Sequence, residues 1–182
     1  MYSLVLLKLY CNSLLSGSPM YLIQLLQKVQ NTAAQITLRA PRVEHISPLL
    51  YFLHWLPVQQ RIKHKVCSIC YATLTGTYPK YISELVNMYI PFRCLHSLSD
   101  SHTLTISYVK TKICGQRSYA YQGPATWNDL PFDLRQKDSL STFKSALKTC
   151  LFHQLTDCNH FCALLCMHSC CKDHEKRQWS RD

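Results

Sequence analysis

The chain has 182 residues, of which 47% are hydrophobic, and a formal net charge of +10. A hydrophobic share of this size is enough to build a core and excludes a chain that is disordered throughout. Only four glycines are present, and neither a GxGxxG nor a GxxxxGK[ST] pattern occurs. These absences argue against the glycine-rich loops that hold phosphates in dinucleotide-binding and P-loop proteins.

The positive charge is unevenly distributed. Residues 1–80 carry eight Lys or Arg and a single acid, Glu44, for a net +7, whereas residues 81–182 carry a net +3. A basic surface attracts polyanions such as nucleic acid or an anionic membrane. Ordinary solubilising charge explains the composition equally well, so the charge alone does not decide between these two interpretations.

The cysteines and the start of the chain bear on its compartment. Eleven cysteines are present, and five of them crowd into residues 158–171, which is not the pattern of a paired disulfide framework. The start has an apolar stretch interrupted by Lys8, without the basic segment of a secretory signal, and no run of 18 apolar residues exists. We therefore expect an intracellular protein, cytoplasmic or nuclear, that is neither secreted nor in a membrane.

The first third of the chain predicts two helices. Residues 19–38 have helical periodicity, with Ser18 as a cap and Pro19 at the first helical position. The apolar residues that recur at helical spacing, and that we expect to face a core, are Leu22, Leu25, Leu26, Val29, Ala33 and Ile36. Pro41 ends this helix, and a short second helix is predicted from Ser47 to Trp55.

A third helix is predicted over 57–74, with Gly76 as its stop. Its apolar stripe is Val58, Ile62, Val66, Ile69 and Cys70. Arg61 and Lys65 lie four residues apart along one edge of that stripe, and Lys63 lies on the opposite edge. The segment 79–89 predicts another short helix.

The remaining chain changes character. The alternation of Leu104, Ile106 and Tyr108, followed by Val109 and Ile113, predicts one short strand or a ragged pair, and Gly115 predicts a turn. Residues 123–131 predict a compact turn or a single helical turn. Ser139 or Ser141 then caps a helix, whose predicted apolar face is Leu140, Phe143, Leu147 and Leu151. The predicted fold class is mainly α: a small helical domain with a short β-strand pair or irregular segment near 100–117.

Motifs for catalysis are missing. Phosphoryl and nucleotidyl transfer need clustered carboxylates to hold a divalent metal, but the ten acids include no adjacent pair of aspartates. No GxSxG pattern marks a nucleophile. A Ser-His-Asp triad scattered along the chain stays open, because its members need not be close in sequence. We expect the chain not to be an enzyme and to have no small-molecule substrate.

Cysteine spacing raises the question of a metal. Cys67 and Cys70 form a lone CxxC inside a predicted helix, where buried apolar thiols are favoured over ligands. In the tail, cysteines recur every four residues, which on a helix places neighbouring thiolates on one face. The candidate zinc ligands are Cys158, Cys162, Cys166 and His160. One helix cannot surround an ion tetrahedrally, so this site needs a second element or chain, and otherwise no cofactor is expected.

Several blocks of the sequence, in order, resemble one protein family. They are LYCNSLLSGSP, LLQKVQNTAAQI, HISPLLYFLHWLPVQQRIKHKV, YPKYISEL, GQRSYAYQGPATWNDLP and SLSTFKSALKTCLF. Together they resemble the C-terminal part of the reverse transcriptase polyprotein of LINE-type (non-LTR) retrotransposons. The resemblance runs over about 6–152. Residues 1–5 and the cysteine-rich tail, 153–182, lie outside the resemblance. Whether this tail is ordered is left open.

The resemblance implies a fragment without catalysis. In the family, the catalytic aspartates lie in the palm, upstream of these blocks, and the endonuclease lies further upstream. The matching module is mostly helical, lies next to the thumb, and helps to hold template RNA and target DNA during target-primed reverse transcription. The implied partners are thus RNA or DNA and the thumb and palm of the parent polyprotein. Lys63 stands where the family more often has an acid, and His64 where it more often has an aromatic residue.

Two hypotheses follow for the function. The first is an accessory module that binds nucleic acid, with phosphate contacts from Arg39, Arg42, Arg61, Lys63, Lys65, Lys110, Lys112 and Arg117. The second is the structural remnant of a decayed transposable element, with no activity of its own and with an apolar face left exposed by the missing polymerase. Under either hypothesis the structural anchors are Trp55, Pro57, Trp127 and Pro131.

Overall fold

A computed structural model describes residues 12–41, 44–90, 102–111 and 114–154. Its helices, in chain order, are η1 (Asn12–Leu15), α2 (Met20–Leu38), α3 (Ile46–Phe52), α4 (Val58–Leu74), α5 (Lys80–Ser83), η2 (Gly115–Arg117), α6 (Tyr119–Asn128), α7 (Phe132–Arg135) and a C-terminal helix over 140–154. Strand pairing among these residues is limited to one antiparallel bridge between Met88 and Leu104. The predicted fold class, mainly α, is confirmed.

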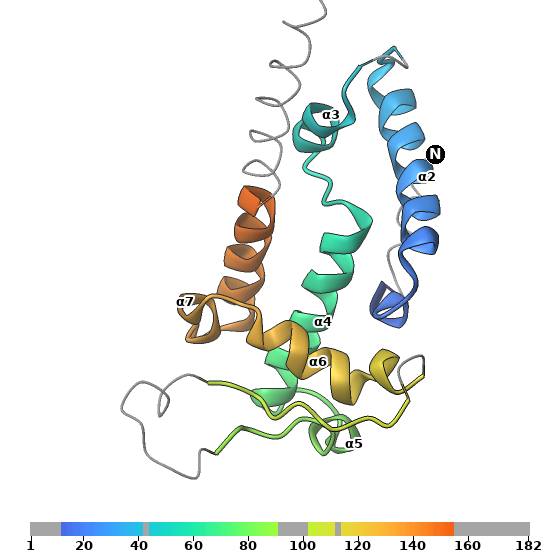
Figure 1. Cartoon of the computed structure of the whole chain (residues 1–182). Helices are drawn as coiled ribbons and strands as arrows, with labels where there is room; N and C mark the ends of the chain where they lie inside the picture. Colours follow the sequence, from blue (N-terminus) through green and yellow to red (C-terminus); the bar gives the residue numbers. More distant parts are fainter. Residues whose placement is uncertain (1–11, 42–43, 91–101, 112–113, 155–182) are drawn as a thin grey trace, which may run out of the picture.

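Helix α4 lies at the centre of the molecule. Figure 1 shows α2 along one side of it and the C-terminal helix along the other, with α6 crossing α4 and with α5 and the extended segments at one end. The contacts of α4 agree with this view, since it packs against α6, α2, α5 and η1. Four of the described helices are therefore arranged around α4, while α3 packs on α2 and η2 packs on α6.

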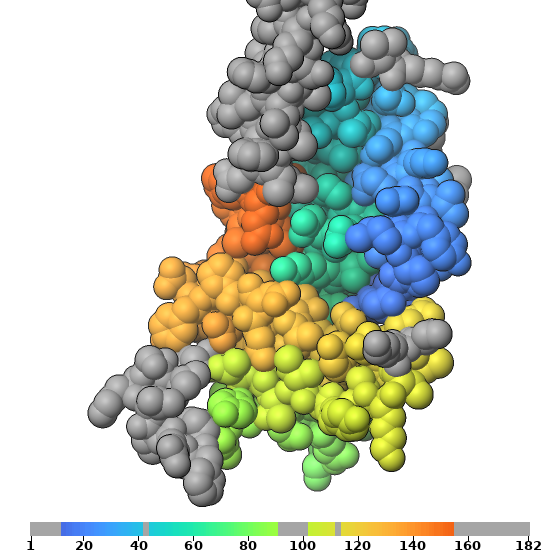
Figure 2. All heavy atoms as spheres, viewed as in Figure 1, coloured from blue at the N-terminus to red at the C-terminus, as the bar shows by residue number. Residues whose placement is uncertain are grey.

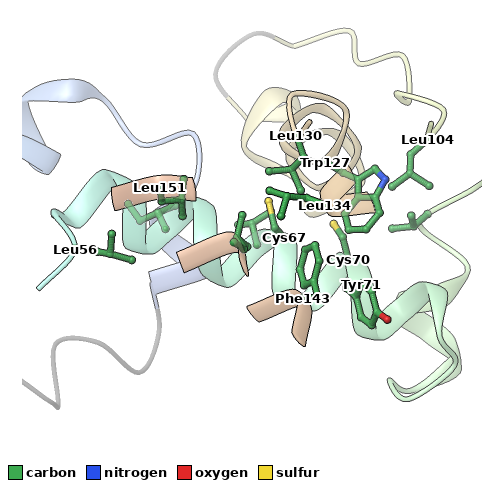
Figure 3. Close-up of a cluster of buried hydrophobic side chains, with 14 residues drawn as sticks. Leu56, Cys67, Cys70, Tyr71, Leu104, Trp127, Leu130, Leu134, Phe143 and Leu151 are labelled. Carbon is green, nitrogen blue, oxygen red and sulfur yellow. The ribbon is translucent and has the colours of Figure 1, made fainter. Parts of the chain in front are cut away.

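The core is built from α4, α6, α7 and the C-terminal helix (Figure 3). Three aromatic rings meet at its centre. Phe143 stacks on Tyr71 with ring centroids 4.6 Å apart, and lies 5.6 Å from Trp127. The buried residues of the cluster are Leu56, Ile62, Val66, Cys67, Cys70, Tyr71, Val86, Leu104, Trp127, Leu130, Leu134, Phe143, Leu147 and Leu151.

The helix predicted over 57–74 is confirmed as α4, and Ile62, Val66 and Cys70 of its predicted stripe are buried. Pro57 precedes the helix but offers no side-chain cap. The cap comes from α2 instead: the Val58 backbone N–H donates to Oε1 of Gln27 over 2.8 Å. One turn further along α2, Nε2 of Gln30 donates to the Leu56 carbonyl oxygen over 2.9 Å. Two glutamines thereby join α2 to the start of α4.

The prediction that the apolar stripe of α2 faces the core is wrong. Leu25 and Ile36 are each 54% exposed, whereas Gln30 is only 7% exposed and Ala34 is fully buried. The physical reason is the pair of glutamine hydrogen bonds, which direct a polar edge of α2 toward α4. Four residues of the stripe are left exposed, Leu22, Leu25, Val29 and Ile36, and Leu26 and Ala33 are half-buried. Ser18 makes no capping hydrogen bond, and the helix begins at Met20.

Two predicted helices are shorter than expected. The helix predicted to reach Trp55 ends at Phe52, because His54 adopts a left-handed conformation with φ of 51° and the Trp55 N–H turns back to the Leu50 carbonyl oxygen over 2.8 Å. The helix predicted over 79–89 ends at Ser83. Two turn residues follow the helix, and further on the Tyr89 N–H donates to the Thr103 carbonyl oxygen over 2.9 Å.

The segment 123–131, predicted as a compact turn or a single helical turn, belongs mostly to a longer helix, α6, which contains Pro124. Gly123 explains why this helix packs so closely on α4: a Cβ at this position would lie 3.1 Å from Sγ of Cys70 and 3.2 Å from the ring of Tyr119. Burial against α4 thus outweighs the helix-breaking tendency of glycine and proline. The predicted cap of the C-terminal helix is confirmed, since the Thr142 N–H donates to Oγ of Ser139 over 3.2 Å.

Candidate nucleic-acid interface

A groove of about 330 Å³ opens where α4, the turn after α3, η1 and the C-terminal helix meet. On the face drawn in Figure 2, the surface of α4 is exposed between α2 (blue) and the C-terminal helix (orange). The groove is lined by Asn12, His54, Leu56, Arg61, His64, Lys65 and Lys148. Three of these side chains are cationic and none is acidic, so the groove attracts anions.

The spacing of the basic residues along α4 determines which of them face the groove. Arg61, His64 and Lys65 are spaced i, i+3 and i+4 on α4 and share one face of it, while Ile62 and Val66 turn inward to the core. Lys148 reaches the same groove from the C-terminal helix, whose other face is buried through Phe143, Leu147 and Leu151. Burial of the two apolar faces therefore fixes the cations opposite one another.

Burial also affects the charges themselves. Arg61 is half-buried, which lowers its pKa, and it makes no ion pair with any residue that the structure describes. The pKa of His64 is lowered, first by burial and then by nearby Lys144, Lys148 and Lys65. Nε2 of His64 donates to the Lys144 carbonyl oxygen over 3.3 Å, which ties α4 to the C-terminal helix. Bringing an anion into the groove relieves this uncompensated positive charge.

Of the six predicted phosphate contacts that lie within the described residues, the groove brings together Arg61 and Lys65 alone. Lys63 lies on the opposite edge of α4, where its Nζ is 3.9 Å from a carboxylate oxygen of Asp129. Arg39 ends α2 in a left-handed conformation, Lys110 is exposed in the segment 102–111, and Nη2 of Arg117 donates to Oγ of Ser18 over 3.4 Å. Arg42 and Lys112 lie outside the described residues.

The predicted anchors occupy different environments. Trp127 is 1% exposed, and its Nε1 donates to the His102 carbonyl oxygen over 2.8 Å. Trp55 is half-buried, and the next residue, Leu56, is the one that enters the core. Pro57 and Pro131 stand immediately before α4 and α7.

The thiols of α4 are packing groups. Cys67 and Cys70 are both fully buried, and the hydroxyl of Tyr119 donates to Sγ of Cys70 over 3.4 Å. Burial raises the pKa of both thiols, that of Cys70 to about 11, so they stay protonated at neutral pH. Because the thiolate is the metal ligand, a raised pKa makes it costlier for these two thiols to bind a metal.

The predicted zinc ligands, Cys158, Cys162, Cys166 and His160, lie outside the described residues. Within the part of the chain that the structure describes, no three His, Cys, Asp or Glu side chains gather in a way that could hold a metal ion. None of the described helices combines the length and apolar character needed to span a membrane.

Sequence reasoning missed five groove residues: Asn12, His54, Leu56, His64 and Lys148. The four-residue spacing of Lys144 and Lys148 was a visible signal that these cations share a face of their helix. Nothing in the sequence indicated that this face lies beside α4, because the two helices are some 80 residues apart and their pairing is set by the core.

We compared the chain with known proteins at three levels. No family model, no curated protein and no solved structure matches it. The resemblance to LINE-type reverse transcriptases therefore depends on the sequence blocks quoted above.

Proposed function

We propose that this chain is a non-catalytic C-terminal fragment of a LINE-type reverse transcriptase, and that it binds the phosphate backbone of nucleic acid as an accessory module. The ordered sequence blocks support the relationship, and the groove supports the activity. The single observation that carries the binding proposal is the meeting of Arg61, Lys65 and Lys148 in a groove without an acidic side chain.

The groove suits a backbone better than a small ligand. Lys65 and Lys148 are exposed, so their charges reach a polymer that lies along the surface, and the half-buried Arg61 supplies a fixed charge between the helices. Phosphate contacts of this kind depend little on base sequence. We therefore infer affinity for RNA or DNA through the backbone, with a strong dependence on salt concentration.

A second candidate function is favoured by a different surface. Helix α2 exposes an apolar stripe that includes Tyr21, Leu22, Leu25, Val29 and Ile36. A contiguous exposed stripe of this kind is typical of a surface that packs against another protein part. Under this alternative the chain is a structural remnant of a transposable element, whose stripe once packed on the polymerase thumb or palm.

A salt titration with matched charge variants tests the first proposal. The double variant Lys65→Gln/Lys148→Gln removes two groove charges, and the control Lys28→Gln/Lys80→Gln removes two exposed charges on α2 and α5. Binding of a fluorescently labelled nucleic acid is followed by anisotropy at several salt concentrations. Each lost phosphate contact to a single strand reduces the magnitude of the negative slope of log K against log salt by about 0.7. The slope of the groove variant should therefore be smaller in magnitude than that of the wild type by about 1.4.

The control pair makes the outcome specific. If both double variants lose the same slope, binding depends on net charge alone and the groove is not the site. If the folded wild-type chain binds no nucleic acid even at low salt, the binding proposal fails and the remnant alternative is left.

A further inference from the structure

An aromatic cluster borders the groove. Tyr51 of α3, His54 of the following turn and Phe152 of the C-terminal helix bring their rings together, with centroids 6.2 Å apart for Tyr51 and Phe152 and 6.5 Å for the other two pairs. The left-handed conformation of His54 makes this possible, because it ends α3 and turns the chain back beside the C-terminal helix. Tyr51 nevertheless remains 57% exposed.

Two groove residues connect the groove to the cluster. His54 lines the groove and also contacts both other rings of the cluster. Lys148 lines the groove too, and its Nζ lies 5.8 Å from the centroid of the Phe152 ring, within the range of a cation–π contact. An exposed aromatic ring is thus continuous with the cationic groove, and the two form one surface.

We propose that this surface binds single-stranded nucleic acid, with backbone phosphates in the groove and a base stacked on Tyr51. The proposal rests on the proposed function and adds the class of ligand. Cations alone bind single strands and duplexes alike, but an exposed aromatic ring can stack only on a base that is free of its neighbours. In a duplex each base is covered on both faces, so Tyr51 gains nothing from it.

The arrangement of Tyr51 suits this role. Its contacts with His54 and Phe152 hold the ring against the protein, with interplanar angles of 46° and 89°, so the ring does not have to be ordered when a base arrives. A preordered side chain loses less conformational entropy on binding. The distribution of charge completes the match, because no acidic side chain of the groove opposes the adjacent phosphate.

The experiment separates stacking from charge. A short labelled RNA is titrated as a single strand and as a duplex with its complement, using the wild type, Tyr51→Ala and Tyr51→Phe. The control Tyr81→Ala removes a tyrosine of α5 that is 69% exposed and does not line the groove. Circular dichroism and the thermal midpoint of each variant show that it has folded.

We expect Tyr51→Ala to weaken binding of the single strand by about fivefold or more and to leave duplex binding unchanged, because only the single strand offers a base for stacking. Tyr51→Phe keeps the ring and should keep the affinity, and Tyr81→Ala should match the wild type. The groove variant Lys65→Gln/Lys148→Gln should weaken both ligands, because both have phosphates.

Other outcomes overturn the inference and can be told apart. If Tyr51→Ala affects neither ligand, or both equally, while the groove variant weakens both, backbone binding stands and stacking is refuted. If no ligand binds the wild type, the proposed function itself fails. Vesicles containing phosphatidylserine serve as a third ligand. If the wild type binds these vesicles as tightly as it binds RNA, and Tyr51→Ala changes neither affinity, the surface is assigned to anionic lipid.

Discussion

Removing Phe143 tests whether the chain folds on its own around the aromatic centre of its core. The Phe143 side chain is fully buried between Tyr71 and Trp127, which lie on α4 and α6. Replacing a buried phenylalanine with alanine loses the transfer free energy of the ring and leaves a cavity, at a cost of about 3–5 kcal/mol. The stacked contact with Tyr71 raises the expected loss from the lower end of this range to about 4 kcal/mol.

The variant Phe143→Leu divides this loss into its parts. Leucine fills most of the volume but cannot stack, so we expect its cost to be about 1–1.5 kcal/mol. The matched control is Phe52→Ala, which removes the same side chain from a position that is 74% exposed and should cost less than about 0.5 kcal/mol.

The assay is urea denaturation followed by circular dichroism, which gives the free energy of unfolding of each variant. Natural domains are stable by about 5–15 kcal/mol, so Phe143→Ala should still fold but with a much lower denaturation midpoint. A loss for Phe143→Ala that matches the loss for Phe52→Ala would refute the reasoning, because it would mean that α4, α6 and the C-terminal helix do not share a core.

Two further predictions concern titratable groups. Because burial lowers the pKa of His64 in the folded protein, the unfolded chain takes up the His64 proton at a higher pH than the folded chain does. The contribution of His64 to the free energy of unfolding is therefore complete above the ordinary pKa of about 6.5 and is lost as the pH drops below it. Thermal midpoints measured from about pH 7 to 5 should show this fall, and His64→Gln, which keeps a donor for the Lys144 carbonyl, should flatten it; an identical profile in both proteins would contradict the prediction. Iodoacetamide, with mass spectrometry of the peptides, should label the exposed Cys114 in the folded protein and reach Cys67 and Cys70 only after unfolding, since these thiols are buried and protonated. Labelling of Cys70 at the rate of Cys114 would show that α4 is not packed as described.

The parts of the fold that were predicted correctly are those where one periodic pattern governs a whole segment. Helix α4 and the C-terminal helix each bury a regular apolar stripe, and the stripe alone indicates both the helix and its inward face. Ser139 supplied the expected cap because its hydroxyl needs only the backbone three residues later, which is local information.

The predictions fail where a residue far away in the sequence determines which face of a helix is buried or how long the helix is. In α2 the apolar stripe was predicted to be buried, but Gln27 and Gln30 find hydrogen-bond partners on the link to α4 and turn the other edge inward. The segment 123–131 was predicted as a compact turn or a single helical turn, whereas close packing of Gly123 against Cys70 favours the longer helix α6. Neither partner can be read from a local window of sequence.

The candidate site also has a part that local sequence predicts and a part that depends on residues far apart in the sequence. Arg61 and Lys65 were predicted to share an edge of α4, because both lie on one helix at a fixed spacing. Lys148 and the rings of Tyr51 and Phe152 join them only through the pairing of the C-terminal helix with α4 and α3. A cationic edge was therefore predictable, and a groove with an aromatic border was not.

The glutamine contacts of α2 have a consequence for the groove, although no residue of α2 lines it. Gln27 caps Val58 at the first turn of α4, and Arg61 follows one turn later, so the position of the groove cation depends on the attachment of α2. A ligand that binds only the assembled groove must then strengthen the attachment of α2. By reciprocity, we expect a partner that binds the outer face of α2 and holds it in place to raise the affinity of the groove for its ligand. The ligand should raise the affinity of α2 for the partner by the same factor. We therefore expect the groove and the outer face of α2 to be thermodynamically coupled, although they share no residue.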